Sequence, residues 1–176
     1  MSNILFRSAD LSPGTGRTVF GTVVPYGQVA EVSDGGGYTY QERFEFGAFG
    51  RSISERGSKV RLFTGHETRK LPIGRAVELQ EHVDGLHASF EIAATRDGDD
   101  ALELVRSGVV DSFSIGFRGV RDRRDGDVVV RTEAALMEVS LVGMPAYPGA
   151  LVAGVRSQSL VIPRSVAEAR LSLLEW

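Results

Sequence analysis

The decisive stretch of sequence covers residues 109–142 and reads VVDSFSIGFRGVRDRRDGDVVVRTEAALMEVSLV. Its two halves, 109–120 and 128–142, are rich in β-branched and apolar residues, and each is long enough for a strand. The charged link between them, 121–127, contains Asp125-Gly126, a dipeptide typical of a hairpin turn. The stretch therefore predicts a long β-hairpin.

Shorter segments on both sides of this hairpin complete the predicted fold. Strands are expected at 17–24, 38–44, 59–63, 72–79 and 85–94, with a loop or hairpin tip at 33–37. Helices are expected at 47–56, stopped by Gly57, and from Asp99 or Asp100 to Ser107, closed by Gly108. Because helices and strands do not alternate, we expect a mostly β fold with peripheral helices (α+β). The sheet is expected to be antiparallel and barrel-like, with about seven strands.

The composition excludes several classes of protein. The chain has 176 residues, of which 42% are hydrophobic and 24% charged, as in an ordinary soluble globular domain. A formal net charge of −3 argues against a protein that coats nucleic acid. With no cysteine, disulfides, thiolate zinc sites and cysteine nucleophiles are excluded. The sequence has no apolar run long enough for a membrane span and no signal-peptide core in residues 1–10, so we expect a cytoplasmic protein.

Three histidines, His66, His82 and His87, are the candidates for imidazole chemistry. Their spacing does not match the paired patterns of metal ligands, so we expect no metal site. His82 lies in a turn and His87 on the outward face of a strand, and both are expected to be solvated. His66 lies in a polar loop directly after an apolar strand, where catalytic groups often occur; a surface histidine is the alternative.

Ser114 lies on the first strand of the long hairpin. Phe113, Ile115 and Phe117 form the apolar face of that strand, and the face around Ser114 carries only small residues. That second face leaves room for a substrate backbone to approach; a solvated strand face is the alternative.

Glu138 lies in the otherwise apolar run 136–142 of the second strand. A buried carboxylate there needs a partner, and an edge position open to water is the alternative. A two-residue Asp125-Gly126 loop would place Ser114 and Glu138 on opposite faces, whereas an odd-length loop or a bulge would place them on the same face. The sequence leaves both arrangements open.

Several motifs occur in an order that resembles a known family. They are Phe20-Gly21 with Pro25-Tyr26-Gly27, Glu42-Arg43-Phe44 with Gly47-Ala48-Phe49, His66 followed by Ile73-Gly74 and Gly85-Leu86, Ser114-Ile115-Gly116-Phe117, and Glu138-Val139-Ser140-Leu141-Val142 with Pro145-Ala146. Over residues 17–152 the chain resembles the phage prohead (capsid maturation) proteases, relatives of the herpesvirus assemblins.

This resemblance implies a serine endopeptidase without a cofactor that acts inside the immature capsid in the host cytoplasm. Its implied partners are the major capsid protein with its scaffold segment and the protease itself, with no nucleic acid or membrane. Ser114 would be the nucleophile and His66 the general base. A homodimer is one open alternative for the oligomeric state.

The chain departs from the family pattern in two places. Gly65 and Glu67 flank His66 where the family commonly has Asn and Asp, and no histidine follows His87 to serve as the second histidine of the herpesvirus relatives. The third residue of the implied catalytic triad, which orients His66, is therefore assigned to Glu138, with Glu67 and Asp111 as alternatives. Backbone N–H groups of the loop 143–147 are expected to form the oxyanion hole.

The predicted domain organisation is a protease domain over 1–156 and a linker with a C-terminal helix over 157–176. Ser165 and Glu168 form a capping box at the start of that helix. Self-cleavage near Ser157–Ser159 would detach it. The alternative functions are a catalytically silent capsid-assembly or scaffold-binding protein on the same fold and, less favoured, a small ligand-binding barrel.

Overall fold

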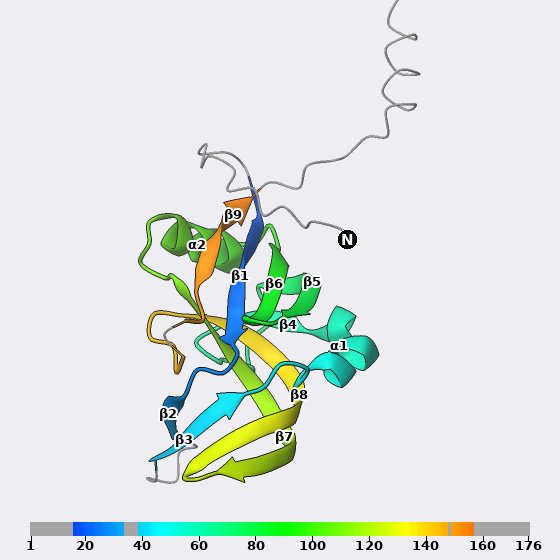
Figure 1. The fold of residues 1–176 in the computed structure, drawn as a ribbon. Coiled ribbons are helices and arrows are strands. Elements are labelled where there is room, and N and C mark those ends of the chain that lie inside the picture. The colour runs from blue at the N-terminus through cyan, green and yellow to red at the C-terminus, as the bar shows by residue number, and fades with distance from the viewer. Residues whose placement is uncertain (1–15, 34–38, 148, 157–176) are drawn as a thin grey trace, which may run out of the picture.

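The long hairpin predicted from residues 109–142 organises the whole sheet (Figure 1). The structure is a computed structural model that describes residues 16–33, 39–147 and 149–156. Its strands are β1 (Thr18–Pro25), β2 (Ala30–Ser33), β3 (Thr39–Phe44), β4 (Arg61–Thr64), β5 (Gly74–His82), β6 (Gly85–Ile92), β7 (Ser112–Asp125), β8 (Val128–Val142) and β9 (Val152–Arg156). Its helices are α1 (Gly50–Arg56), the 3₁₀ turn η1 (Gly57–Lys59) and α2 (Arg96–Arg106).

The sheet is mixed and open. Its order is β2-β3-β8-β4-β5-β6-β1-β9, and β7 pairs with β8 off this path. The prediction of a mostly β fold with peripheral helices is confirmed, but the prediction of an antiparallel, barrel-like sheet of about seven strands is wrong. Both β3 and β4 run parallel to β8, and the described residues form nine strands because β2 and β9 were not expected.

Helix α1 lies between the two parallel pairings along one edge of β8. Strand β3 pairs with β8 at 128–131, and β4 pairs with it at 139–141. In the interval between them, the backbone N–H of Ala134 donates to Ala48 O (2.8 Å) and that of Leu136 donates to Ser52 Oγ (2.9 Å). The helix and the turn just before it, which contains Ala48, therefore satisfy these strand N–H groups in the gap between the two pairings.

The ends of both helices differ from the sequence expectation. Gly57 has φ −51°, so it continues into η1 and is not a left-handed stop. Helix α2 begins earlier than predicted, because the Thr95 side chain accepts a hydrogen bond from the Gly98 N–H (3.2 Å) and caps the helix; Asp99 lies inside its first turn. Gly108 has φ +73°, in agreement with the predicted helix stop.

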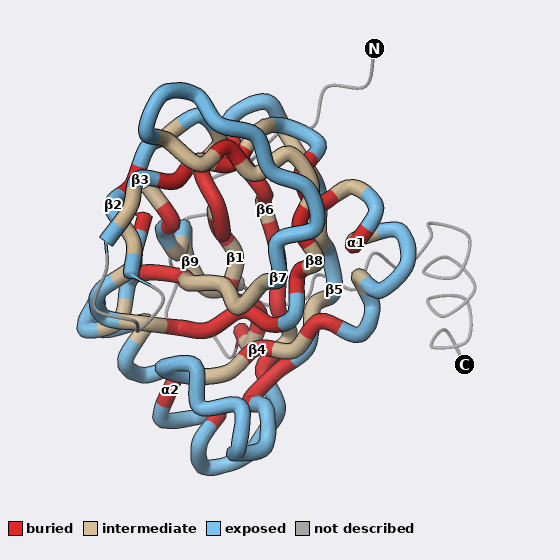
Figure 2. The backbone as a smooth tube through the Cα atoms, turned by 90° about the horizontal axis from the view of Figure 1, so that it is seen from below, coloured by how far each residue is buried: buried red, intermediate tan, exposed pale blue. Residues whose placement is uncertain are grey.

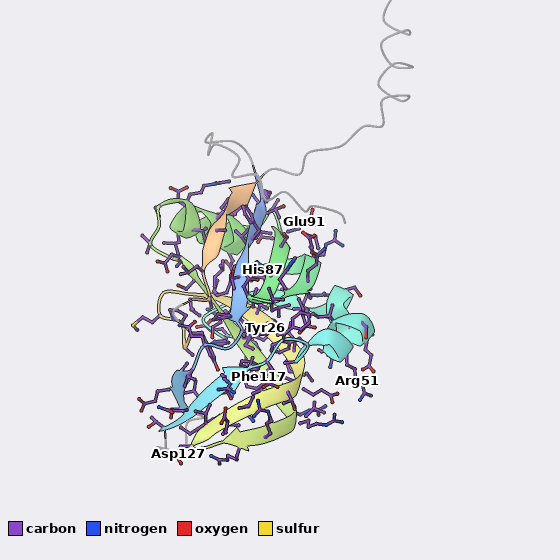
Figure 3. The ribbon with its side chains drawn as sticks, viewed as in Figure 1. Tyr26, Arg51, His87, Glu91, Phe117 and Asp127 are labelled. Carbon is purple, nitrogen blue, oxygen red and sulfur yellow. The ribbon has the colours of Figure 1, made fainter. Side chains whose placement is uncertain are left out.

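The hydrophobic core lies on the face of the sheet opposite the polar residues of the hairpin. The predicted apolar face of β6 is confirmed, since Leu86 and Phe90 are fully buried and Ala88 nearly so. Phe44 lies at the centre of an aromatic cluster, with ring centroids 5.1 Å from Phe49 and 5.0 Å from Phe117. Figure 2 shows that the far part of β7 is exposed while much of β8 is buried, and Figure 3 shows Phe117 where the hairpin passes β3.

Two predictions lie outside the described residues. They are the linker with its C-terminal helix over 157–176 and most of the loop predicted at 33–37, of which Ser33 ends β2. The antiparallel pairing of β2 with β3 agrees with a hairpin at that place.

Candidate active site

A β-bulge on β8 decides which face Glu138 occupies. Phe117 pairs with Leu136, but Gly116 pairs with Glu138, so Met137 is an extra residue between the two pairs. Before the bulge Leu136 points into the core; after it Glu138 points to the opposite face. The hairpin has two other register shifts, near Arg121. One adds a residue to β7 and the other adds a residue to β8, so together they leave the register unchanged. The bulge therefore places Glu138 on the same face as Ser114.

Ser114 pairs directly with Ser140, and the neighbouring pair on the same face is Gly116 with Glu138. Directly opposed residues of an antiparallel ladder have Cβ atoms about 5 Å apart, so these side chains share one small area. A Cβ at Gly116 would lie 2.6 Å from Glu138 Oε1, which is closer than real contacts allow. Glycine at 116 thus provides the space in which the carboxylate lies.

His66 reaches the same area from the loop after β4. Strand β4 pairs with β8 through Phe63 and Ser140, and the Gly65 N–H continues this contact by donating to Leu141 O (3.0 Å). The backbone then turns sharply: Gly65 has φ +56° and His66 has φ +60°. His66 is the only non-glycine residue with positive φ in the described part of the chain, and this left-handed conformation costs an L-residue about 1–2 kcal/mol.

The His66 ring contacts Glu138 directly. Its Nδ1 lies 2.6 Å from Glu138 Oε1, with the carboxylate buried (8% of its side chain exposed) and the ring partly exposed (42%). A carboxylate only accepts hydrogen bonds, so Nδ1 carries the proton and donates it. In the neutral ring Nε2 is then the unprotonated nitrogen, which is the form required of a general base.

Ser140 completes the contacts around His66. Its hydroxyl donates to Glu138 Oε2 (2.8 Å) and accepts from the His66 backbone N–H (3.1 Å). It is fully buried, whereas Ser114, directly across the ladder, is partly exposed. Of these two serines, Ser114 is therefore the one that a substrate can approach.

The other predicted candidates lie in different contacts. Glu67 pairs with Lys70, and Asp111 accepts a hydrogen bond from the Ser112 hydroxyl (2.6 Å). His87 Nε2 lies 3.1 Å from Asp84 Oδ1, and its ring packs against that of His82 at a centroid distance of 5.0 Å. The structure thus brings together His66 and Glu138, on the face that also holds Ser114, and not these alternatives.

The chain just after the loop expected to hold the oxyanion hole runs along the start of β7. Ala150 O accepts a hydrogen bond from the Phe113 N–H (2.8 Å), and Leu151 bridges to Ser112. Within the loop Tyr147 is buried, and its hydroxyl donates to Glu42 Oε1 (2.9 Å). Burial and the adjacent Glu42 raise the pKa of Tyr147.

Glu42 anchors this loop to the strands beneath it. Its carboxylate is almost fully buried and accepts from Arg131 Nε (2.6 Å) as well as from Tyr147. Desolvation opposes the charge of Arg131, but Glu42 and Asp122 outweigh it and raise the pKa of the guanidinium. The sequence motifs contain Glu42 and Ser140 but predict no role for either. Ser140 stands out as a polar residue in the apolar end of β8, whereas β3 is polar over most of its length and Glu42 carries no such signal.

No group of three or more His, Cys, Asp or Glu side chains able to hold a metal ion occurs among the residues that the structure describes. In the same residues, no helix combines the length and the apolar character that crossing a membrane requires.

Comparisons with known proteins agree with the order of the motifs. A family model described as caudovirus prohead serine protease matches residues 5–162. The prohead protease of Enterobacteria phage HK97 is 28% identical over 117 residues, which are 63% of this chain and 51% of that protein. The prohead protease of Escherichia phage T5 is 35% identical over 86 residues, 48% of this chain and 40% of that protein.

The chain spans about half the length, or less, of these two curated relatives. The family model, in contrast, matches most of the chain, including the hairpin, the His66 loop and the loop after β8. The protein therefore belongs to the caudovirus prohead serine protease family.

Proposed function

We propose that this protein is a serine endopeptidase of phage capsid maturation, with Ser114 as nucleophile, His66 as general base and Glu138 as the residue that orients His66. The observation that carries the proposal is the 2.6 Å contact between His66 Nδ1 and the buried Glu138 carboxylate. It leaves Nε2 as the proton acceptor on the face of the hairpin that holds Ser114.

The proposed reaction is acyl transfer to Ser114 followed by hydrolysis. Nε2 of His66 takes the hydroxyl proton as Ser114 Oγ bonds to the scissile carbonyl carbon. The C–N bond then breaks, and the same proton passes to the leaving amine. A water molecule next gives one proton to Nε2 and its oxygen to the acyl carbon, which releases the new carboxyl end and returns the proton to Ser114. Glu138 stays ionised and stabilises the imidazolium.

Backbone N–H groups of the loop 143–147 are the proposed donors to the oxyanion. The chain on both sides of this loop contacts the start of β7, since Val142 pairs with Ser112 and Ala150 O accepts from the Phe113 N–H, and Tyr147 within the loop binds Glu42. Donors fixed before the reaction stabilise developing charge without reorganisation.

The proposed substrates are the major capsid protein, with removal of its scaffold segment inside the immature capsid in the host cell, and the protease itself near Ser157–Ser159. A pocket of about 290 Å³ beside the His66 loop offers room for a substrate side chain; Phe63 and Glu67 lie on one wall and Leu104 of α2 on the other. Phe63 pairs with Ser140, which in turn pairs with Ser114, so this lining residue of the pocket lies two strands across the sheet from the candidate nucleophile. The relation to the herpesvirus assemblins stays a prediction.

The test uses the full chain and its Ser114→Ala variant. Each is co-expressed with the major capsid protein of the same phage or prophage, and each purified protein is treated with a fluorophosphonate that labels reactive serines. We expect wild type to trim the capsid protein, to shorten its own C-terminus and to take the label on Ser114. Ser114→Ala is expected to lose all three. Intact-mass and peptide mass spectrometry report each readout separately.

Ser112→Ala is the matched control, because Ser112 lies two residues earlier on the same face and its hydroxyl binds Asp111. It is expected to keep both trimming and labelling. Capsid trimming by folded Ser114→Ala would exclude Ser114 as nucleophile. Wild type that neither trims nor takes the label would favour the catalytically silent assembly protein, and identical C-termini would exclude self-cleavage alone.

A further inference from the structure

The hydrogen bonds around His66 form a closed cycle. The His66 backbone N–H donates to Ser140 Oγ (3.1 Å), and Ser140 Oγ donates to Glu138 Oε2 (2.8 Å). The other carboxylate oxygen, Oε1, accepts from His66 Nδ1 (2.6 Å). The hydrogen-bond cycle thus begins at the main chain of His66 and ends at its side chain.

The direction of each hydrogen bond in this cycle is set by the chemistry of its donors and acceptors. A backbone N–H can only donate, so Ser140 Oγ must be the acceptor from His66. The single hydroxyl proton of Ser140 is then free to donate to Glu138, whose carboxylate can only accept. Burial of Ser140 (0% exposed) keeps water from replacing either bond. The Ser140 hydroxyl therefore accepts from His66 and donates to Glu138 at the same time.

The hydrogen-bond cycle also helps to hold the strained backbone of His66. A left-handed φ of +60° is unfavourable for a histidine, and the turn persists only if its surroundings hold it. The bond from the His66 N–H to Ser140 is a contact that ties the turn to β8, directly beside the Gly65 N–H bond to Leu141 O. Ser140 thus acts on the main chain of His66 and on the carboxylate that holds its ring.

We propose that Ser140 is a positioning residue: it couples the His66 turn to Glu138 and so holds the ring in the orientation and tautomer that leave Nε2 free to accept a proton. This inference rests on the proposed function for its effect on catalysis. Its effect on the imidazole does not rest on the proposed function, because the hydrogen bond and the tautomer of the imidazole exist whether or not the protein cleaves a substrate.

The test compares Ser140→Ala with Ser140→Thr, which keeps the hydroxyl, and with the control Ser89→Ala. Ser89 is also a buried serine, but it lies on β6, three strands from β8 in the sheet. Cleavage of purified capsid precursor is measured for kcat and KM. Nitrogen-15 and proton NMR of the imidazole report the tautomer and the Nδ1–H signal in a Ser114→Ala background, which prevents self-cleavage.

We expect Ser140→Ala to lower kcat by about 10- to 100-fold with little change in KM, as for other groups that orient a functional histidine. Its NMR spectrum is expected to show a mixture of tautomers and a weakened Nδ1–H signal. Ser140→Thr is expected to recover part of kcat and part of the Nδ1–H signal. Ser89→Ala is expected to match wild type in kcat and in the NMR spectrum.

The two readouts separate the two proposals. If wild type shows no protease activity but Ser140→Ala still disturbs the tautomer, the proposed function fails and the positioning role stands. If folded Ser140→Ala keeps the tautomer and the Nδ1–H signal of the Ser89→Ala control, Ser140 does not position His66, whatever the rates. Normal NMR spectra with a lowered kcat would likewise overturn the positioning role.

Discussion

The contacts that stabilise the buried Glu138 carboxylate are the same ones that give it its proposed role. A lone buried carboxylate is costly, but here one oxygen accepts from His66 and the other from Ser140. Gly116 leaves the space that the carboxylate fills. The same contacts that make the burial tolerable also set the hydrogen-bonding state of the imidazole.

Glu138→Gln is the sharpest change at this scale. The amide nearly matches the carboxylate in shape but carries no charge and can present N–H to the ring, which favours the wrong tautomer. We expect kcat for cleavage of capsid precursor to fall by about 10³- to 10⁴-fold, the scale of an Asp-to-Asn change in a serine protease triad. KM is expected to change little.

Glu67→Gln is the matched control, because Glu67 follows His66 in the loop but pairs with Lys70. It is expected to retain the wild-type kcat. A Glu138→Gln protein with near-wild-type kcat, alongside a strongly impaired Glu67→Gln protein, would transfer the orienting role to Glu67.

The bulge in β8 is the decisive feature among the elements. Apolar residues occupy even positions before it, including Ala134 and Leu136, and odd positions after it, Val139 and Leu141. If β8 alternated regularly through Met137, with no bulge, Glu138 would point to the core face like Leu136. Helix α1 supports the bulge from the side, because Ser52 accepts the Leu136 N–H immediately before it.

Ser52→Ala tests this support. The Leu136 N–H would lose its partner in a buried place, and we expect the free energy of unfolding to fall by about 1–3 kcal/mol. Urea unfolding followed by circular dichroism measures the change. Ser54→Ala is the control, since Ser54 lies on the same helix and its exposed hydroxyl binds only Arg51 O. An equal loss of stability in both variants would show that the Ser52–Leu136 bond contributes nothing specific.

At the scale of the molecule, the buried Tyr147 and the partly buried Tyr26 join separate parts of the sheet through carboxylates. Tyr147 connects the loop after β8 to Glu42 of β3, and Tyr26, after β1, binds Glu81 of β5 (2.5 Å). Burial, followed by the adjacent carboxylate, raises the pKa of each phenol above its ordinary value. In the folded state both phenols therefore stay protonated at pH values at which the unfolded chain loses those protons.

This difference predicts a loss of stability in alkali. The contribution of the two phenols is fully present below the pKa of an unfolded tyrosine, about 10, and is lost as the pH rises above it toward the folded values. We expect Tm to fall more between pH 8 and about pH 11 in wild type than in the Tyr26→Phe/Tyr147→Phe double variant. Calorimetry measures both. Equal falls in the two proteins would contradict the prediction.

Much of this protein could be predicted from local sequence pattern. The alternation in β6, the second run of the hairpin and the stop at Gly108 depend on neighbouring residues alone, and all three agree with the structure. The first run differs in its bounds: β7 begins at Ser112 and continues to Asp125, through most of the link predicted at 121–127. The ends of α1 and α2 were less predictable, because Gly57 and Asp99 were each compatible with more than one position relative to a helix end.

Residue types by themselves determined that the nucleophile could not be cysteine and that only three imidazoles were available. They also placed Ser114, His66 and Glu138 on the strands and loop where the structure has them. Only the tertiary structure decided that His66 meets Glu138 and that the latter shares a face with Ser114. The physical reason is that one extra residue in a β-ladder reverses every side chain beyond it, and that reversal is set by long-range pairing and by α1 rather than by any local preference.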